Sequence, residues 1–172
     1  MFRILMTSAA VAFALVTPAF AQDDLTDPQI AHIAYTAGEL DIAAAEQALQ
    51  KSTNPVVTEF AQTMARDHRA VNEQALALVE KLGVTPEDNA TSAALTKAAN
   101  ATLAELGGLD GEAFDAAYVV NEVTFHQTVN DALKTTLIPS ADNAELQTLL
   151  EAGLTLFSEH QLHAEHLAAT FQ

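Results

Sequence analysis

The spacing of apolar residues between residues 55 and 82 constrains the fold more than any other feature of this sequence. Successive positions on one seam are alternately four and three residues apart: Val57, Ala61, Met64, His68, Val71, Ala75, Leu78 and Leu82. This period places them on one face of an α-helix, as in the buried seam of a helical bundle. His68 is the one ionisable member, and it lies in the middle of the seam.

Glycine and proline residues divide the chain into further helices. Pro28 and Pro55 each follow an Asp or Asn that can cap a helix, and Gly83 is placed to end one. Gly107 and Pro139 mark two later breaks. The pattern predicts four long helices and a shorter helix after the second of them, covering residues 28–51, 55–82, 92–106, 111–137 and 142–170.

The order of these helices predicts an all-α fold. Tight turns join the first long helix to the second and the third to the fourth, whereas a long connection containing the short helix separates the second from the third. Such connectivity is typical of a ferritin-like four-helix bundle with one long crossover. We predict that a single domain of this kind covers residues 22–172.

The first residues of the chain predict an export signal. Arg3 supplies a positive charge, residues 4–16 are almost entirely apolar, Pro18 breaks this run, and residues 19–21 read Ala-Phe-Ala. An apolar run of this length before such a cleavage site is typical of a bacterial secretory signal peptide and is short for a membrane span. We predict a cleavable signal peptide over residues 1–21 and a periplasmic or secreted protein without a membrane span after processing.

The composition excludes several classes of site. The chain has no cysteine, which excludes catalytic thiols, zinc-thiolate sites and c-type haem attachment. Its formal net charge is −16, and so acidic a surface repels nucleic acids and anionic lipid headgroups while attracting cations. This charge excludes a nucleic-acid partner, and without a phosphate-binding loop we expect no nucleotide. A haem between Met64 and a histidine is possible in a bundle, but no specific feature supports it, so we expect no haem.

Each predicted long helix carries at least one ionisable residue within its core face. The first has Asp41 among alanines, the second has His68, the third has Glu122 and His126, and the fourth has His160. At a rise of 1.5 Å per residue these positions fall near the middle of the bundle. Burying such groups without partners costs several kcal/mol, so they should contact one another, a metal ion or water.

Two interpretations of this convergence are open. In the first, Asp41, His68, His126 and His160 bind a metal ion, since three imidazoles and a carboxylate suit zinc or copper. In the second, no metal binds, and the carboxylates hydrogen-bond the histidines in a polar network that fixes the register of the helices.

Further ionisable residues extend or limit the metal interpretation. The additional ligand candidates are Glu122, His163 and Asp67, whereas His166 points away from the core and should be solvated. A di-iron bundle needs Glu-x-x-His on two helices, and no glutamate lies three residues before His68, His126 or His160. Ferroxidase chemistry is therefore not expected.

Several segments resemble the bacterial domain-of-unknown-function 4142 family. Residues 54–68, which read NPVVTEFAQTMARDH, are the most specific. The FDxxY pattern at residues 114–118, followed by His126, resembles the third helix of the family, and Glu159-His160 resembles its last. The match covers essentially the whole chain after residue 21.

This resemblance implies an exported, ferritin-like bundle and carries no established activity. It points to the residues that the seams also select, namely Asp41, His68, His126 and His160. The family usually has a glutamate where Asp41 stands, so the side chain here is one methylene shorter.

Taken together, these patterns favour a periplasmic binding protein for copper or zinc over an enzyme. The alternative is a metal-free structural or interaction module of the cell envelope. An oxidoreductase that uses the metal for redox chemistry is a third class, and the sequence indicates no particular protein partner.

Overall fold

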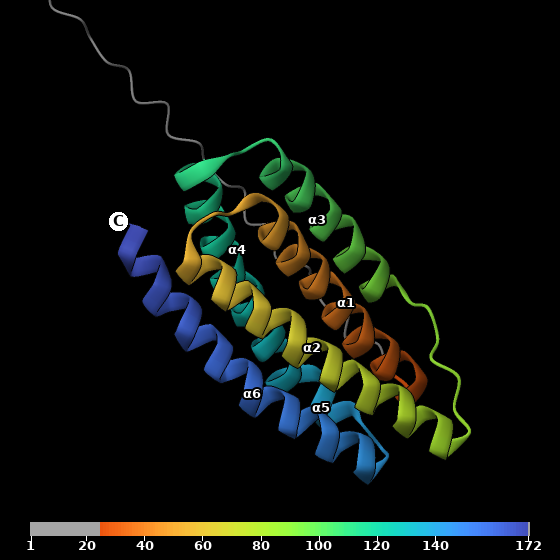
Figure 1. Cartoon of the computed structure of the whole chain (residues 1–172). Coiled ribbons are helices and arrows are strands. Elements are labelled where there is room, and N and C mark those ends of the chain that lie inside the picture. The colour runs from red at the N-terminus through yellow and green to blue at the C-terminus, as the bar shows by residue number, and fades with distance from the viewer. Residues whose placement is uncertain (1–24, 172) are drawn as a thin grey trace, which may run out of the picture.

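Helices make up nearly all of the computed structural model, which describes residues 25–171. Five of them are longer than one turn, and within this range there is no strand (Figure 1). Their bounds are Asp27–Lys51 (α1), Pro55–Leu82 (α2), Ala90–Gly107 (α3), Gly111–Ala132 (α4) and Ala144–Ala168 (α6). The predicted all-α class is confirmed. The predicted signal peptide lies outside the described residues.

The helices begin and end where local chemistry favours it. The Asn54 side chain accepts a hydrogen bond from the backbone N–H of Val56 ahead of α2, and Gly83 ends this helix with a φ of 65°. Asn89 caps α3 and Asn143 caps α6 in the same way as Asn54. These contacts satisfy N–H groups that the first turn of a helix leaves without partners. The predicted ends at Lys51 and Leu82 are confirmed.

The third predicted long helix differs from expectation in its last part. The α-helix α4 stops at Ala132 and continues as a π-helix (η1, Leu133–Leu137) and a short α-helix (α5, Ile138–Ser140). Pro139 therefore lies inside the helical path instead of ending it. A proline lacks the N–H that would bond to the preceding turn, and the wider π turn accommodates this local mismatch. The last helix is two residues shorter than predicted at each end, and a 3₁₀ turn (η2, Ala169–Phe171) follows it.

The long helices pack in two pairs, and the two pairs contact each other. Helix α1 packs against α2, and α4 against α6; α2 also contacts α6, and α1 contacts α4 (Figure 1). Helix α3, in the connection between α2 and α4, lies along the outer side of α1 (Figure 1). Every helix within residues 25–171 is too short or too polar to span a membrane.

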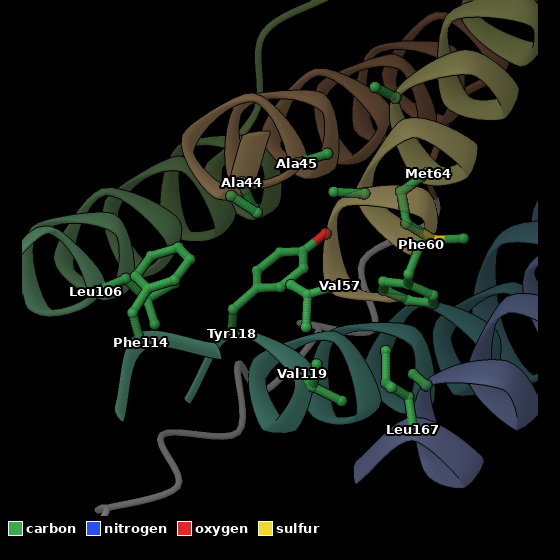
Figure 2. Close-up of a cluster of buried hydrophobic side chains, with 14 residues drawn as sticks. Ala44, Ala45, Val57, Phe60, Met64, Leu106, Phe114, Tyr118, Val119 and Leu167 are labelled. Atoms are coloured by element: carbon green, nitrogen blue, oxygen red, sulfur yellow. The ribbon is translucent and has the colours of Figure 1, made fainter. Parts of the chain in front are cut away.

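Two hydrophobic clusters fill the core at opposite ends of the helices. The first, shown in Figure 2, includes Phe60, Tyr118 and Leu167. The second includes Ile30 and Leu150, with Leu133 and Leu137 from η1. Five buried ionisable residues lie between these clusters, with apolar packing on both sides: Asp41, His68, Glu122, His126 and His160.

A close approach of α1 to α2 fixes the level of these ionisable residues. A Cβ atom at Gly38 would lie 2.2 Å from Oδ1 of Asn72, so only glycine permits this contact. Asn72 is buried and donates a hydrogen bond to Oε1 of Glu39 at 2.8 Å. Asp41 lies one turn after Gly38, and His68 one turn before Asn72. The contact therefore holds these two side chains at the same height.

Candidate metal centre

The four predicted metal ligands are buried and lie together in the core. The exposed fraction is 1% for Asp41 and His68, 0% for His126 and 4% for His160. Glu122, which the sequence placed among the additional candidates, is also 0% exposed. Each of the four long helices thus contributes at least one of these side chains, as the seams predicted.

The side chains form two overlapping groups that could hold a metal ion. One nitrogen each from His68, His126 and His160 lies within 4.8 Å of the other two. One ligand atom each from Asp41, Glu122 and His126 forms a second group with the same limit. His126 belongs to both groups, so the imidazoles and the carboxylates meet around it.

The separation of the two central imidazoles suits a shared metal ion. Nε2 of His68 lies 3.4 Å from Nε2 of His126. Two nitrogens bound tetrahedrally to zinc, at about 2.0–2.1 Å each, are separated by about 3.3–3.4 Å. Oδ2 of Asp41 lies 3.1 Å from Nε2 of His68, but without the alignment of a hydrogen bond. The carboxylate is thus beside the two nitrogens and remains free to bind.

The backbone of α4 fixes the tautomer of His126. Its Nδ1 lies 2.9 Å from the carbonyl oxygen of Glu122, one turn earlier in the helix. A carbonyl oxygen can only accept a hydrogen bond, so Nδ1 must carry the proton and donate it. In the neutral ring Nε2 then has a free lone pair. This is the second hydrogen bond that orients a metal-binding histidine in known metal sites.

Asp67 fixes His160 in a comparable way. Its Oδ2 lies 3.1 Å from Nε2 of His160, and its Oδ1 accepts a hydrogen bond of 2.7 Å from Nε of Arg66. The hydrogen bond from Arg66 lowers the pKa of Asp67, so this carboxyl is charged and Nε2 of His160 donates to it. The free lone pair of His160 is then on Nδ1. Asp67 therefore supports His160, and it belongs to neither group of converging ligands.

Buried polar atoms without hydrogen-bond partners are concentrated at this place. Both carboxylate oxygens of Asp41, Oε2 of Glu122, Nδ1 of His68 and Nδ1 of His160 have none among the described residues. Such atoms are rare in folded proteins, because each costs about 1–3 kcal/mol. A bound cation would give the oxygens and the Nδ1 atom of His160 a partner.

Burial keeps the imidazoles neutral and favours protonated carboxyls. Desolvation lowers the pKa of His68 to about 3 and that of His126 to about 4, and it also lowers the pKa of His160. Desolvation raises the pKa of Asp41. Desolvation also raises the pKa of Glu122 well above its usual range, and the charge of the neighbouring Asp41 raises it further. Neutral imidazoles are the form that binds metals.

We expect the buried histidines to make the protein sensitive to acid in the presence of a chelator. The pKa of His68 is near 6.5 when unfolded and about 3 when folded, so its contribution to stability is complete above pH 6.5 and decreases as the pH falls toward 3. One such group changes the free energy of unfolding by about 1.4 kcal/mol per pH unit within this window.

Urea unfolding at several pH values between 7 and 4 measures this effect. The curve of His68→Gln should fall less steeply than that of the unsubstituted protein, whereas His166→Gln, which changes an exposed residue, should follow it. The carboxyls titrate in all three proteins, so their contribution largely cancels. Parallel curves for His68→Gln and the unsubstituted protein would contradict the assignment of a neutral buried His68.

The remaining candidate, His163, lies outside the cluster. It is exposed, and its ring packs perpendicular to that of Phe60 with the ring centres 5.0 Å apart. His166 is exposed, as its position on the helix predicted.

Sequence reasoning missed Phe157 as a member of the site. Its ring is stacked on that of His68 with a centre distance of 4.5 Å and an interplanar angle of 3°. Asn130 donates a hydrogen bond of 3.2 Å to the backbone carbonyl of Phe157 and so joins α4 to α6 at this level. Its spacing in the sequence could have indicated this role, because Phe157 precedes His160 by three residues and therefore lies on the same face of the helix.

The chain matches a known protein family over most of its length. The family model described as "Domain of unknown function (DUF4142)" matches residues 14–167. No curated protein and no solved structure matches the chain.

Proposed function

We propose that this chain, which belongs to the DUF4142 family, binds one divalent transition-metal ion, zinc or copper, between its long helices. His126, through Nε2, and His160, through Nδ1, are the ligands with fixed tautomers. His68 and Asp41 complete the set of ligands, and Glu122 is a further candidate ligand beside Asp41. One observation carries this proposal. Buried polar atoms without hydrogen-bond partners lie together around two imidazole nitrogens that are 3.4 Å apart.

The charges of the buried groups suit a divalent cation. Asp41 and Glu122 are shielded from water, which favours their protonated forms. A dication that replaces these protons gives the carboxylates an opposite charge, and the low dielectric around them strengthens the attraction. Imidazole nitrogens with one or two carboxylates favour zinc and copper over magnesium and calcium, which prefer an all-oxygen set.

The proposal includes a particular fold and location. The four long helices, α1, α2, α4 and α6, form a ferritin-like bundle in which the connection with α3 is the long crossover. Residues 1–21 act as a cleavable signal peptide, and the remaining chain works as a metal-binding protein in the periplasm or outside the cell. The pairing of α1 with α2 and of α4 with α6 supports the bundle.

The alternative is a metal-free structural or interaction module of the cell envelope. The hydrogen bonds of His126 with the Glu122 carbonyl and of His160 with Asp67 favour it, because they also serve a polar network. In this alternative the oxygens of Asp41 have only the neighbouring Glu122 carboxyl as a partner, whereas the metal proposal gives them a cation. The two differ in a measurable way, since only one requires stoichiometric uptake of metal.

Titration of chelator-treated protein with Co²⁺ and Cu²⁺ tests the proposal. We expect one bound ion per chain. The Co²⁺ form should absorb visible light as strongly as sites of low coordination number do, and the Cu²⁺ electron paramagnetic resonance spectrum should show splitting by nitrogen. Binding should also release protons from the buried carboxyls, which calorimetry in two buffers measures.

The matched pair of variants for this titration is His126→Gln and His163→Gln. The first should lose the spectra, and the second, which changes an exposed ring outside the cluster, should keep them. Retention of the spectra by His126→Gln, or uptake of only a small fraction of an ion per chain, would contradict the proposal.

A further inference from the structure

A cavity of about 50 Å³ lies in the core next to the candidate metal centre. It extends from His68 and Phe157 toward the end of the molecule that holds Ile30 and Leu150, and α1, α2, α4, η1 and α6 contribute to its wall. Most of the wall is aliphatic, with Ile33 from α1, Leu133 and Leu137 from η1, and Leu150 from α6. The cavity is thus mainly apolar and borders the group of converging ligands at His68.

The polar groups in the wall are few, and two of the three already use their donors elsewhere. Thr128 donates its hydroxyl to the carbonyl of Thr124 at 2.9 Å, and the amide of Asn72 donates to Glu39. The third polar group is His68, whose ring faces Phe157. A buried water requires about two to four polar partners, which this wall does not supply. The wall therefore favours an apolar occupant over water.

The size of the cavity limits that occupant. A cavity of about 150 Å³ lined by similar side chains holds a benzene molecule, which has six heavy atoms, or a xenon atom. In proportion, 50 Å³ holds about two heavy atoms. A charged or strongly polar molecule of this size would lose its hydration without compensation.

We propose that this cavity is a binding site for a small, neutral, apolar molecule of the size of a diatomic gas, in contact with the ring of His68. His68 lines the cavity and also contributes Nε2 to the candidate metal centre, so the molecule and the ligand cluster share one side chain. The π-helix η1 supplies part of the wall, and such segments widen a helix locally. The site goes beyond the metal proposal and does not depend on it.

Xenon is the probe that tests this site. The chain is labelled with ¹³C at its methyl groups, freed of metal with a chelator, and studied by NMR under increasing xenon pressure. We expect saturable shifts for the methyl groups of Ile33, Leu133 and Leu150, which line the cavity, and none for Val57 and Val119 in the opposite cluster. Shifts of equal size in both clusters, or shifts that do not saturate, would overturn the proposal.

Variants that fill the cavity give a second test of the site. Ala132→Leu should weaken the xenon response at least tenfold, and Ala101→Leu, on the exposed surface of α3, should leave it unchanged. Gly153→Ala is the conservative filling variant, because its Cβ would meet the Phe157 ring at an ordinary 3.5 Å. It should weaken the response severalfold with the fold intact, even if Ala132→Leu proves too large. A full response in Gly153→Ala would count against the site, and none of these outcomes affects the metal titration.

Discussion

Replacing His68 with alanine should abolish the stabilisation that zinc or copper gives to the protein. Metal that binds only the folded state adds RT ln(1 + [L]/Kd) to the free energy of unfolding, which is about 2.7 kcal/mol at a hundredfold excess over Kd. His68 lies 3.4 Å from His126 and 3.1 Å from Asp41, so its loss removes the ligand that connects the imidazoles to this carboxylate. We expect the increment to fall to a few tenths of a kcal/mol.

The measurement is urea unfolding of each protein with and without metal. The difference between the two conditions is compared, because His68→Ala also destabilises the metal-free protein through the space that it leaves. His166→Ala is the matched control, since it removes an exposed imidazole from the last helix. If His166→Ala loses the increment and His68→Ala keeps it, the metal binds to surface histidines and the proposed site is wrong.

The second large effect is expected for Phe157→Ala. This side chain is 8% exposed, its ring is stacked on that of His68, and it forms part of the cavity wall. Truncation of a buried phenylalanine usually costs about 3–5 kcal/mol through lost burial and the new void. Here the void would join the existing cavity, so we expect a loss of about 4 kcal/mol in the free energy of unfolding.

Two further variants separate packing from mere loss of apolar surface. Phe157→Leu keeps most of the volume and should cost less than about 1.5 kcal/mol. Phe171→Ala removes the same side chain from the terminal 3₁₀ turn, which is only partly buried, and should cost less than Phe157→Ala. Equal losses for Phe157→Ala and Phe171→Ala would show that the stacked position has no special role.

The helices and the identity of the buried polar residues could be predicted from sequence for simple reasons. A period of 3.6 residues determines which side chains share a face, and this alone selects His68 and His160 as members of apolar seams. Proline and glycine at Pro55 and Gly83 act through local backbone geometry, so they locate helix ends without knowledge of the fold.

Distances between helices could not be predicted in this way. The role of Asp67 depends on the rotation of α2 against α6, because the residue precedes His68 yet contacts His160 on the other helix. The stack of Phe157 on His68 and the π turn after Ala132 likewise arise from packing between segments far apart in sequence. Periodicity describes one helix at a time and contains no information on such contacts.

The shared ring of His68 has a thermodynamic consequence. Its Nε2 atom belongs to the candidate metal centre, and the same ring lines the cavity. The metal ion and the gas would therefore contact a single side chain. Linkage then requires reciprocity: if a gas in the cavity changes the affinity for metal by some factor, the metal changes the affinity for the gas by the same factor. Wherever that factor differs from one, a change in the local concentration of the gas would change the amount of bound cation.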